Sequence, residues 1–306
     1  MLWNISKMLK ICKYCFKIIS FTLFFALPCS WGANNIITDQ AGRQVILPKQ
    51  PMRVVSLAPS ITEIVFALGQ GNFLKGVTLF SDFPPEAKKI SKVGSYVHLN
   101  IEKIMFLKPD VCIAIKDGNP KAAINRLEEL GIPVFAANPK NIETLIEAII
   151  QIGKILSAEA EGEILTAEMR NRVQRVVSLS SKADNRPGVF FQIGIAPIVS
   201  AGTKTFVNEL IKLAGGENLT KGMVTYPRYS REQVLNLAPD IIIVTSMTRN
   251  TIFEQVKKEW ESWPHLPAAR NHQIFLVNSD LFDRPAPRLI DGLELLFKII
   301  HPALNN

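Results

Sequence analysis

The chain has 306 residues, of which 47% are hydrophobic and 20% are charged, and its formal net charge is +8. Four of the lysines lie within the first seventeen residues, and the net charge falls to about +4 without them. Because the rest of the chain has no cluster of Lys and Arg, this composition argues against a nucleic-acid-binding protein.

The N-terminus has the layout of a secretory signal peptide. Four lysines precede the apolar stretch 18–27, and the small residues Ser30 and Gly32 come just before Ala33. We therefore expect residues 1–32 to be removed by cleavage and the protein to reach the periplasm. The apolar stretch is too short for a comfortable transmembrane helix, although an uncleaved N-terminal anchor remains the alternative.

The cysteines add little chemistry to the mature chain. Three of the four (Cys12, Cys15 and Cys29) fall in the leader, and the spacing of the first two is best explained by chance. A lipoprotein attached through Cys29 is disfavoured because Pro28 stands where a small residue is expected. Cys112 lies in an apolar run and is expected to be a small core residue, so the mature chain has no intramolecular disulfide.

The first half of the mature chain alternates between strand and helix signals. Strands are predicted at 53–57, 76–79, 111–115 and 133–136, and helices at 63–68, 101–107 and 122–130. Ser60 or Thr62 is the expected cap of the first helix. This alternation is typical of a parallel sheet with helices on both faces.

Between residues 141 and 181 the apolar positions follow helical spacing without a strand signal, which predicts one long helix or a helix pair. A coiled coil is less favoured because the apolar stripe is short and irregular. The second half again alternates: strands are predicted at 188–193 and 273–277, and helices at 208–213, 253–260 and 286–300.

One unit occurs twice, 130 residues apart. Residues 101–110 (IEKIMFLKPD) and 231–240 (REQVLNLAPD) each predict a short helix that ends at Pro-Asp and leads into an apolar strand. Glu102 and Glu232 occupy the same position in the two copies. A long period of this kind indicates two similar α/β lobes, and such proteins usually have a cleft between the lobes.

Seven segments together resemble a known family, the periplasmic cobalamin (vitamin B12)-binding proteins of ABC importers. These segments are 53–63 (RVVSLAPSITE), 81–85 (SDFPP), 107–110 (LKPD), 191–195 (FQIGI), 215–218 (GGEN), 229–234 (YSREQV) and 279–284 (SDLFDR). The resemblance covers essentially the whole mature chain. It implies the α/β fold of class III periplasmic binding proteins, with Rossmann-like lobes at 33–140 and 184–306 joined by a long rigid helix at 141–183.

The resemblance also implies a ligand site in the interlobe cleft. The matching positions are Phe80, Tyr96, Ile115, Ile193, Tyr226, Asp280 and Arg284. Aromatic rings suit the apolar faces of a corrin, and an acid and an arginine suit its amide fringe. The alternatives are that Phe80 belongs to the core and that Asp280 and Arg284 form a surface ion pair of little energetic value.

The sequence departs from the family pattern at three of these positions. Ile115 and Ile193 are aliphatic where aromatic rings are expected, and Tyr226 replaces a larger ring. The disulfide of the family is also missing, because Ala214 stands at one cysteine position. Fewer stacking surfaces predict weaker cobalamin binding or another planar ligand, such as haem or a ferric siderophore held through a tyrosine.

The two matched glutamates have a separate role by resemblance. In this class one surface glutamate per lobe docks on arginines of the inner-membrane permease, which works with an ATPase. Glu102 and Glu232 are therefore the expected docking residues, and an acid also stabilises a helix N-terminus without any partner. The resemblance further implies a monomer that carries cobalamin as cargo and needs no cofactor.

Catalytic motifs are not found. The sequence has no Gly-x-Ser-x-Gly, no phosphate-binding Gly-Lys-Ser and no His-Glu-x-x-His. The four histidines are scattered and are expected on the surface, which argues against a metal site; only His98, near Tyr96, is considered for ligand contact. A metallocluster enzyme on the same architecture would need more than one cysteine.

Overall fold

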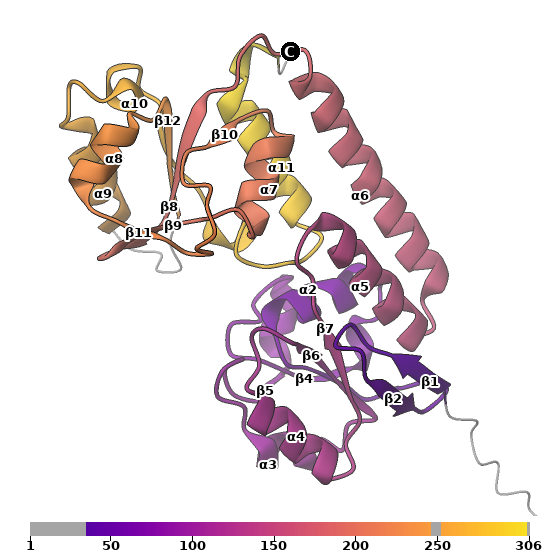
Figure 1. Cartoon of the computed structure of the whole chain (residues 1–306). Helices are drawn as coiled ribbons and strands as arrows, with labels where there is room; N and C mark the ends of the chain where they lie inside the picture. Colours follow the sequence, from indigo (N-terminus) through magenta and orange to yellow (C-terminus); the bar gives the residue numbers. More distant parts are fainter. Residues whose placement is uncertain (1–34, 246–251, 305–306) are drawn as a thin grey trace, which may run out of the picture. The chain divides into compact units, whose positions relative to one another are not determined.

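The computed structural model describes residues 35–245 and 252–304, which form one compact unit (Figure 1). The expected signal peptide lies outside the described residues. Within them, every helix is too short or too polar to cross a bilayer.

The first sheet is parallel throughout. Its strand order is β5-β4-β3-β6-β7, with β3 (Val54–Ser56), β4 (Leu74–Val77), β5 (Ser91–Lys92), β6 (Val111–Ile115) and β7 (Val134–Ala137). The helices α2 (Pro59–Ala67), α3 (Ile101–Phe106) and α4 (Lys121–Glu129) connect these strands, and the short helices η1 (Gly71–Phe73) and η2 (Pro85–Lys89) flank β4. This is the alternation that the sequence predicts.

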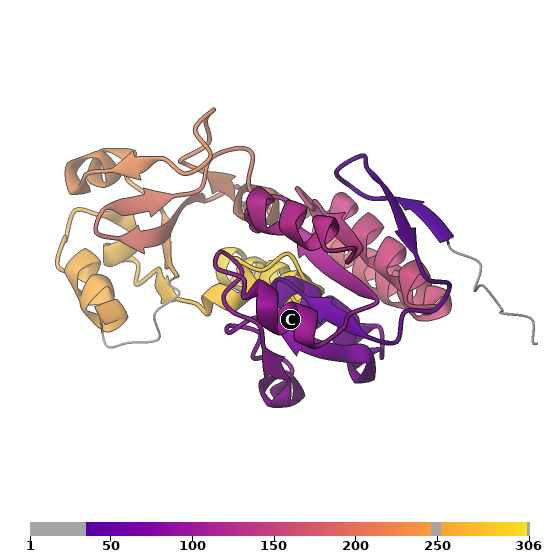
Figure 2. The ribbon, with the colours of Figure 1, turned by 90° about the horizontal axis from the view of Figure 1, so that it is seen from below.

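A separate antiparallel hairpin precedes this sheet. It consists of β1 (Asn35–Thr38) and β2 (Gln44–Leu47). The Gln40 amide in its turn donates to the Thr144 carbonyl, 2.9 Å away, and the backbone N–H of Gln40 donates to the Ala136 carbonyl of β7. These two hydrogen bonds fix the turn against β7 of the first sheet and against the helix that follows β7 (Figure 2).

The second sheet is mixed. Its order is β11-β9-β8-β12-β13, and β10 pairs with the beginning of β8. The strands are β8 (Gly188–Ile195), β9 (Ile198–Ser200), β10 (Glu217–Asn218), β11 (Arg228–Tyr229), β12 (Ile241–Val244) and β13 (Ile274–Leu276). β8, β12 and β13 are parallel, whereas β9 runs antiparallel to β8 and to β11.

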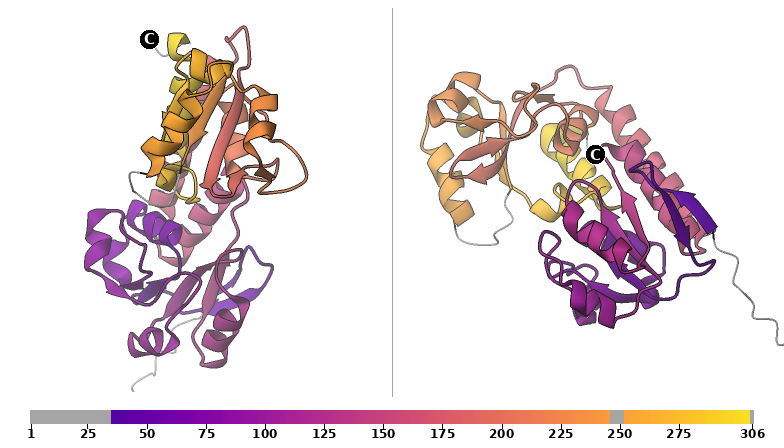
Figure 3. Two further views of the ribbon diagram at one scale, coloured as in Figure 1. Left: turned by 90° about the vertical axis from the view of Figure 1, so that its left-hand side faces the viewer. Right: turned by 60° about the horizontal axis from the view of Figure 1, so that its bottom comes forward.

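Helices accompany the second sheet along the chain (Figure 3). They are α7 (Phe206–Leu213), α8 (Arg231–Leu237), α9 (Ile252–Glu261), α10 (Pro267–Arg270) and α11 (Leu289–Ile300), with the short helices η3 (Ser279–Leu281) and η4 (Pro302–Leu304). The last long helix therefore begins three residues later than the predicted start at residue 286.

Alternate residues of the central strands enter different core clusters, which shows that both faces of each sheet are covered. In β6, Val111 and Ile113 join the largest cluster, while Cys112 and Ala114 join a second one. In β12, Ile241 and Ile243 join the same largest cluster, while Ile242 and Val244 face the other side. The expected core position of Cys112 is confirmed, and burial raises the pKa of its thiol.

The connecting segment is a helix pair. α5 (Ile142–Ile155) and α6 (Glu159–Ser180) pack against each other and are separated by Ser157, whose φ is +53°. Asn141 caps α5 through a capping box with Thr144. α5 packs on α2 of the first lobe, and α6 continues to α7 and α11 of the second, so α6 is the long helix of the connection (Figure 1).

The duplicated unit is repeated in backbone detail. Lys108 and Ala238, each just before Pro-Asp, both have a φ of +45°, which non-glycine residues seldom adopt. A carboxylate oxygen of Asp110 accepts hydrogen bonds from the backbone N–H of Met52 and of Arg53 before β3, and Asp240 accepts from Gly188 at the start of β8. In both lobes the aspartate thus ties the end of a helix to the start of the neighbouring parallel strand.

The predicted cap of the first helix is wrong. α2 begins at Pro59, whose fixed φ suits the first turn of a helix, and no side chain caps it. Ser60 and Thr62 are buried inside the helix instead. The Thr62 hydroxyl contacts those of Ser56 and Ser81 at 2.8 and 3.0 Å, so it joins α2 to the end of β3 and to the loop after β4.

Candidate ligand-binding site

Most of the predicted ligand residues lie at or beyond the carboxyl ends of parallel strands. Phe80 follows β4, Tyr96 follows β5, Ile115 ends β6, and Asp280 follows β13. Ile193 lies in the last half of β8, and Tyr226 comes shortly before β11. In open α/β sheets this is the edge at which ligands bind.

A buried asparagine that the sequence interpretation missed organises the site in the first lobe. Asn119 is 7% exposed, and its oxygen accepts from the Ile115 N–H at 2.8 Å. Its amide donates to the carbonyls of Leu57 and Tyr96, each at 2.8 Å. Ile115 and Tyr96 also adjoin Gly118, where a Cβ would lie 2.8 Å from Ile115 Cγ2 and 3.6 Å from Tyr96 Cδ2. The structure therefore brings Tyr96 and Ile115 together.

Arg284 is the centre of an acidic cluster. One terminal nitrogen, Nη1, lies 3.1 Å from Glu63 Oε1 and 3.0 Å from Asp82 Oδ1, and Nη2 lies 3.0 Å from Asp280 Oδ1. The side chains of Arg284 and Asp280 are each 15% exposed, so the alternative of a simple surface pair is wrong. Burial opposes the charge of Arg284, but the contacts with Asp82, Asp280 and Glu63 outweigh it and raise the pKa.

Arg288 completes this cluster. Its Nε donates to Glu63 Oε2 at 2.8 Å, and Nη2 donates to Oε1 at 2.7 Å. The guanidinium lies over the Phe83 ring, 3.7 Å from the ring centre. Glu63 comes from α2 in the first lobe, whereas both arginines come from the segment before α11 (Figure 1). The ion pairs therefore join the two lobes directly.

Tyr226 lies at the edge of this cluster. Burial raises the pKa of its phenol, and the nearby Asp283 raises it further. Burial also raises the pKa of Asp283, to about 6, with repulsion from Asp280 adding to the shift and Arg284 opposing it. Both residues are accessible to solvent.

The other candidates differ in exposure. Phe80 is 57% exposed, so its alternative placement in the core is wrong. Ile115 and Ile193 are half-buried and pack against the largest core cluster. Phe80 lies two residues before Asp82 and is thereby placed near the acidic cluster, whereas Ile193 contributes mainly to packing at the end of β8.

The two docking candidates are both exposed in the first turn of a helix. Asn100 caps α3, and Ser230 caps α8 through a capping box with Gln233. A hydrogen bond to Ser230 lowers the pKa of Glu232, which keeps this acid ionised. The structure thus presents one solvent-facing acid at the same position of each duplicated unit.

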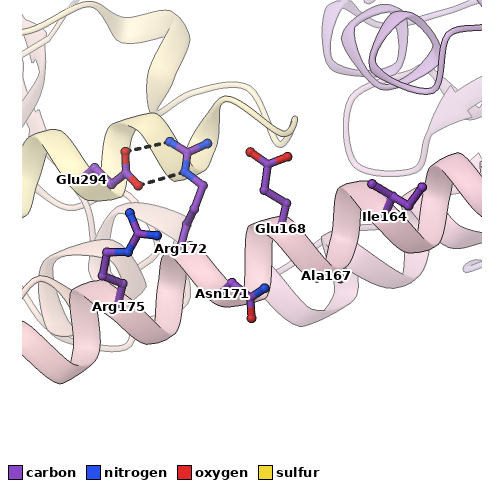
Figure 4. A pocket seen from close by; sticks show the side chains of 7 residues that line it. All are labelled: Ile164, Ala167, Glu168, Asn171, Arg172, Arg175 and Glu294. Atoms are coloured by element: carbon purple, nitrogen blue, oxygen red, sulfur yellow. Dashed lines mark hydrogen bonds and ion pairs between the residues drawn. The ribbon is translucent and has the colours of Figure 1, made fainter.

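A surface pocket lies elsewhere, along α6, and contains none of the predicted ligand residues (Figure 4). Arg172 reaches from α6 to α11, where it bonds both carboxylate oxygens of Glu294 at 2.8 and 2.7 Å and Asp291 at 2.6 Å. These contacts raise its pKa. Because two acids already bind its guanidinium, Arg172 links α6 to α11. This pocket therefore offers little to a ligand.

One histidine differs from expectation. His98, His265 and His272 are exposed, but His301 is only 6% exposed and its Nε2 lies 3.3 Å from the Gly215 carbonyl. The expected surface position is therefore wrong for His301, which packs under the end of α11 beside Phe297. His98 lies in the exposed turn after Tyr96.

Several known proteins are similar to this chain. A vitamin B12-binding protein of Vibrio campbellii is 30% identical over 275 residues, which cover 89% of this chain and 94% of that protein. An uncharacterized ABC transporter substrate-binding lipoprotein of Bacillus subtilis is 32% identical over 273 residues, covering 87% of this chain and 85% of that protein.

Solved structures are similar over the same region. The periplasmic vitamin B12-binding protein of Vibrio cholerae matches with a TM-score of 0.74 at 30% identity, covering 85% of this chain and all of that one. A periplasmic haem-binding protein from Roseiflexus sp. RS-1 matches with a TM-score of 0.72 at 28% identity, covering 83% of this chain and 99% of that one. These similarities confirm the two-lobed α/β fold of class III periplasmic binding proteins.

The model of one family, described as periplasmic binding protein, matches residues 54–281. This range contains both sheets, the helices α5 and α6 and most of the ligand candidates. Such proteins carry a transported ligand to an ABC importer and are not enzymes. The chain belongs to the periplasmic binding protein family and is the substrate-binding component of an ABC transporter.

Proposed function

We propose that this protein captures cobalamin in the periplasm and delivers it to an inner-membrane permease. Tyr96, Phe80 and Tyr226 would cover the apolar faces of the corrin, with Ile115 and Ile193 filling the space behind them. Asp280 and Arg284 would meet its amide fringe. Support comes from the placement of these residues at strand ends and from the vitamin B12-binding relatives.

One observation carries the choice of ligand: both arginines of the site are already paired with carboxylates. The charged groups around the site are four acids and three bases. The acids are Glu63, Asp82, Asp280 and Asp283, and the bases are Arg284, Arg288 and Lys92. The Lys92 ammonium is attracted to Asp82. A surplus of acid opposes anionic ligands such as haem, with its two propionates, or a catecholate siderophore. It suits a ligand whose rim consists of neutral amides.

The alternative is a haem or ferric-siderophore protein of the same class, which the haem-binding neighbour keeps open. In that alternative Tyr96, Tyr226 or Tyr229 would serve either as an ionised phenol that binds iron or as a hydrogen-bond donor to the ligand. The raised pKa values of Tyr226 and Tyr229 oppose this ionisation. Tyr229 also packs edge-on against Phe190, with 5.7 Å between the ring centres.

The remaining parts of the proposal concern organisation. Residues 1–32 would be a cleaved signal peptide, followed by the lobes 33–140 and 184–306 and the connector 141–183, in a monomeric protein. Glu102 and Glu232 would dock on arginines of the permease, one per lobe. Their matched exposure at the start of α3 and α8 supports this assignment.

A calorimetric titration of the chain from Ala33 onward, with cyanocobalamin and haemin in parallel, tests the ligand. We expect sub-micromolar binding of cyanocobalamin, a free energy of about −8 kcal/mol or stronger, and much weaker binding of haemin. Binding of haemin without cyanocobalamin would reject cobalamin as the ligand and favour the alternative.

A further inference from the structure

The loop after β4 places an aspartate of the first lobe against an arginine of the second. Asp82 Oδ1 lies 3.0 Å from Arg284 Nη1, the nitrogen that also contacts Glu63 Oε1 at 3.1 Å. Asp82 and Arg284 are 202 positions apart in the sequence, so only the folded chain brings them together. The ligand candidate Arg284 is therefore held in position by two acids of the other lobe.

These two acids differ in their access to solvent. The side chain of Glu63 is 2% exposed, whereas that of Asp82 is 31% exposed. The buried Glu63 can orient Arg284 but cannot reach a ligand. Asp82 binds the same nitrogen and remains accessible. A ligand atom bonded to Arg284 would lie within roughly 8 Å of the Asp82 carboxylate, because two hydrogen bonds and one guanidinium separate them.

The loop that carries Asp82 is fixed in place. Lys92 Nζ donates to the carbonyls of Ser81 and Ala87 at 2.9 and 3.0 Å. The Ser81 hydroxyl accepts a hydrogen bond from that of Thr62 in α2 at 3.0 Å, and Ser81 is 1% exposed. Because Asp82 follows Ser81 directly in the chain, its carboxylate extends from a buried and anchored backbone. Its ion pair thus differs from a pair of mobile surface side chains.

We propose that Asp82 is a specificity-determining residue of the ligand site, which lets Arg284 donate to neutral amides of the ligand and keeps carboxylates away. Glu63 is a positioning residue that acts through Arg284. This inference rests on the proposed function. A guanidinium can donate to an amide carbonyl as well as to a carboxylate. A nearby ionised acid destabilises only the charged group, so the Asp82 carboxylate decides between the two.

Corrinoids that differ in one group test the proposal on the chain from Ala33 onward. Calorimetry at neutral pH compares cyanocobalamin with its monocarboxylic acids, in each of which one peripheral propionamide is hydrolysed to a carboxylate. We expect the wild type to bind cyanocobalamin at least about tenfold more tightly than the most disfavoured acid, which corresponds to one pKa unit of repulsion. Asp82→Asn should bring these two affinities to within about threefold of each other.

Two further measurements separate charge from structure. Asp82→Glu keeps the carboxylate and should keep the preference for the amide, even if it weakens the binding of both ligands. In the wild type the preference should shrink as salt is added, because screening weakens the repulsion. This second measurement needs no variant, so it tests the proposal even if Asp82→Asn does not fold.

Glu128→Gln is the matched control. Glu128 is 39% exposed and is one of two acids that bind Arg43, the other being Asp39. Arg43 also donates to the carbonyl of Val134, the first residue of β7, so this cluster lies at the opposite end of the strands from the ligand candidates. The control should leave both affinities unchanged. An equal fall of the preference in Glu128→Gln would assign it to the net charge and overturn the role of Asp82.

The failure of this inference is distinguishable from that of the proposed function. If cyanocobalamin binds, but the wild type shows no preference or Asp82→Asn keeps it, the inference is wrong and the proposed function stands. Haemin and its dimethyl ester form a second pair that differs in the charge of the propionates. If only this pair binds, the proposed ligand is wrong, and a gain of haemin over the ester in Asp82→Asn decides the inference by itself. Binding of neither pair would overturn both proposals.

Discussion

Arg288 holds Glu63 with two hydrogen bonds of 2.8 and 2.7 Å, and these join the segment before α11 to α2 of the other lobe. The Glu63 side chain is 2% exposed. A buried carboxylate is tolerated at this place because two guanidiniums surround it, and each of them would lose a partner without it.

Replacing Glu63 with Gln should therefore reduce the free energy of unfolding by about 2–3 kcal/mol, since two partly buried arginines lose a charged partner. Denaturant unfolding measures this change. The matched control is Glu128→Gln, because Glu128 forms an exposed pair with Arg43, and its loss should cost less than about 1 kcal/mol. Equal losses of unfolding free energy in the two variants would show that the ion pairs of Glu63 between the lobes stabilise the fold no more than an exposed pair does.

The raised pKa of Asp283 predicts a pH dependence of stability. Between its ordinary value of 3.8 and its folded value of about 6, the folded protein holds a proton that the unfolded chain releases. This group therefore opposes folding above pH 6, and the effect disappears as the pH falls below 3.8.

Asp283→Asn should remove this dependence and stabilise the protein at pH 7.5, by no more than about 1 kcal/mol because the side chain is exposed to solvent. The measurement is the difference in unfolding free energy between variant and wild type from pH 4 to pH 8. That difference should grow as the pH rises from 4 to 6 and level off above 6. A constant difference over this range would mean that the Asp283 carboxyl titrates near its ordinary pKa.

The left-handed backbone at Ala238 predicts a stabilising glycine. A φ of +45° is unfavourable for a residue with a Cβ. Ala238→Gly should raise the free energy of unfolding by about 0.5–1 kcal/mol, after the higher entropy of the unfolded glycine chain is subtracted. Ala122→Gly on the exposed side of α4 is the control and should have the opposite sign. Two destabilised variants would argue against strain at position 238.

The docking proposal predicts a separation of transport from binding. Glu102→Lys and Glu232→Lys should each impair uptake of the ligand by cells and leave the calorimetric affinity unchanged. Glu161→Lys is the control, because Glu161 is also an exposed acid in the first turn of a helix, α6, outside the duplicated units. Normal uptake with both charge reversals would disprove docking through these acids and leave the helix dipole as their role.

Asn119 predicts a coupling between stability and affinity. Asn119→Ala would leave the Ile115 N–H and two buried carbonyls without their partner, at a cost of about 2–3 kcal/mol in unfolding free energy. The affinity for the ligand should also fall, because Tyr96 loses an anchor of its backbone. Asn125→Ala, at an exposed position of α4, should change neither quantity. Unchanged affinity in a destabilised Asn119 variant would show that the position of Tyr96 does not matter for ligand binding.

The spacing of apolar residues, together with the prolines and glycines that end helices and strands, predicts most of the fold. The Pro-Asp pairs that precede β6 and β12 predict both strands. The apolar residues at helical spacing after Asn141 predict the helix pair α5 and α6. The predicted start of α2 is wrong because Ser60 or Thr62 is the expected cap, whereas Pro59 already occupies the first turn of the helix. A proline after a strand can either break the chain before a helix or begin the helix. Local rules do not distinguish these two roles of proline, since both fix the same φ.

The site was predicted only in part. Asp280 and Arg284 emerged from the family resemblance, but their partners Glu63 and Asp82 lie about two hundred residues away in the sequence, and only the folded chain brings them together. The role of Asn119 depends on three backbone groups from separate elements, which no sequence spacing reveals. Conversely, Glu63 stands in the recognised segment 53–63, and its charge between apolar residues of α2 was a signal that could have been used.

The largest core cluster contains strand residues of both sheets, such as Val54 of β3 and Ile243 of β12, together with residues of α5, α6 and α11. The two lobes therefore do not have independent interiors. Heating should melt them together in one cooperative transition, and neither lobe should be obtainable as a separate folded fragment. Although the chain contains one structural unit twice, the two copies belong to a single cooperative folding unit.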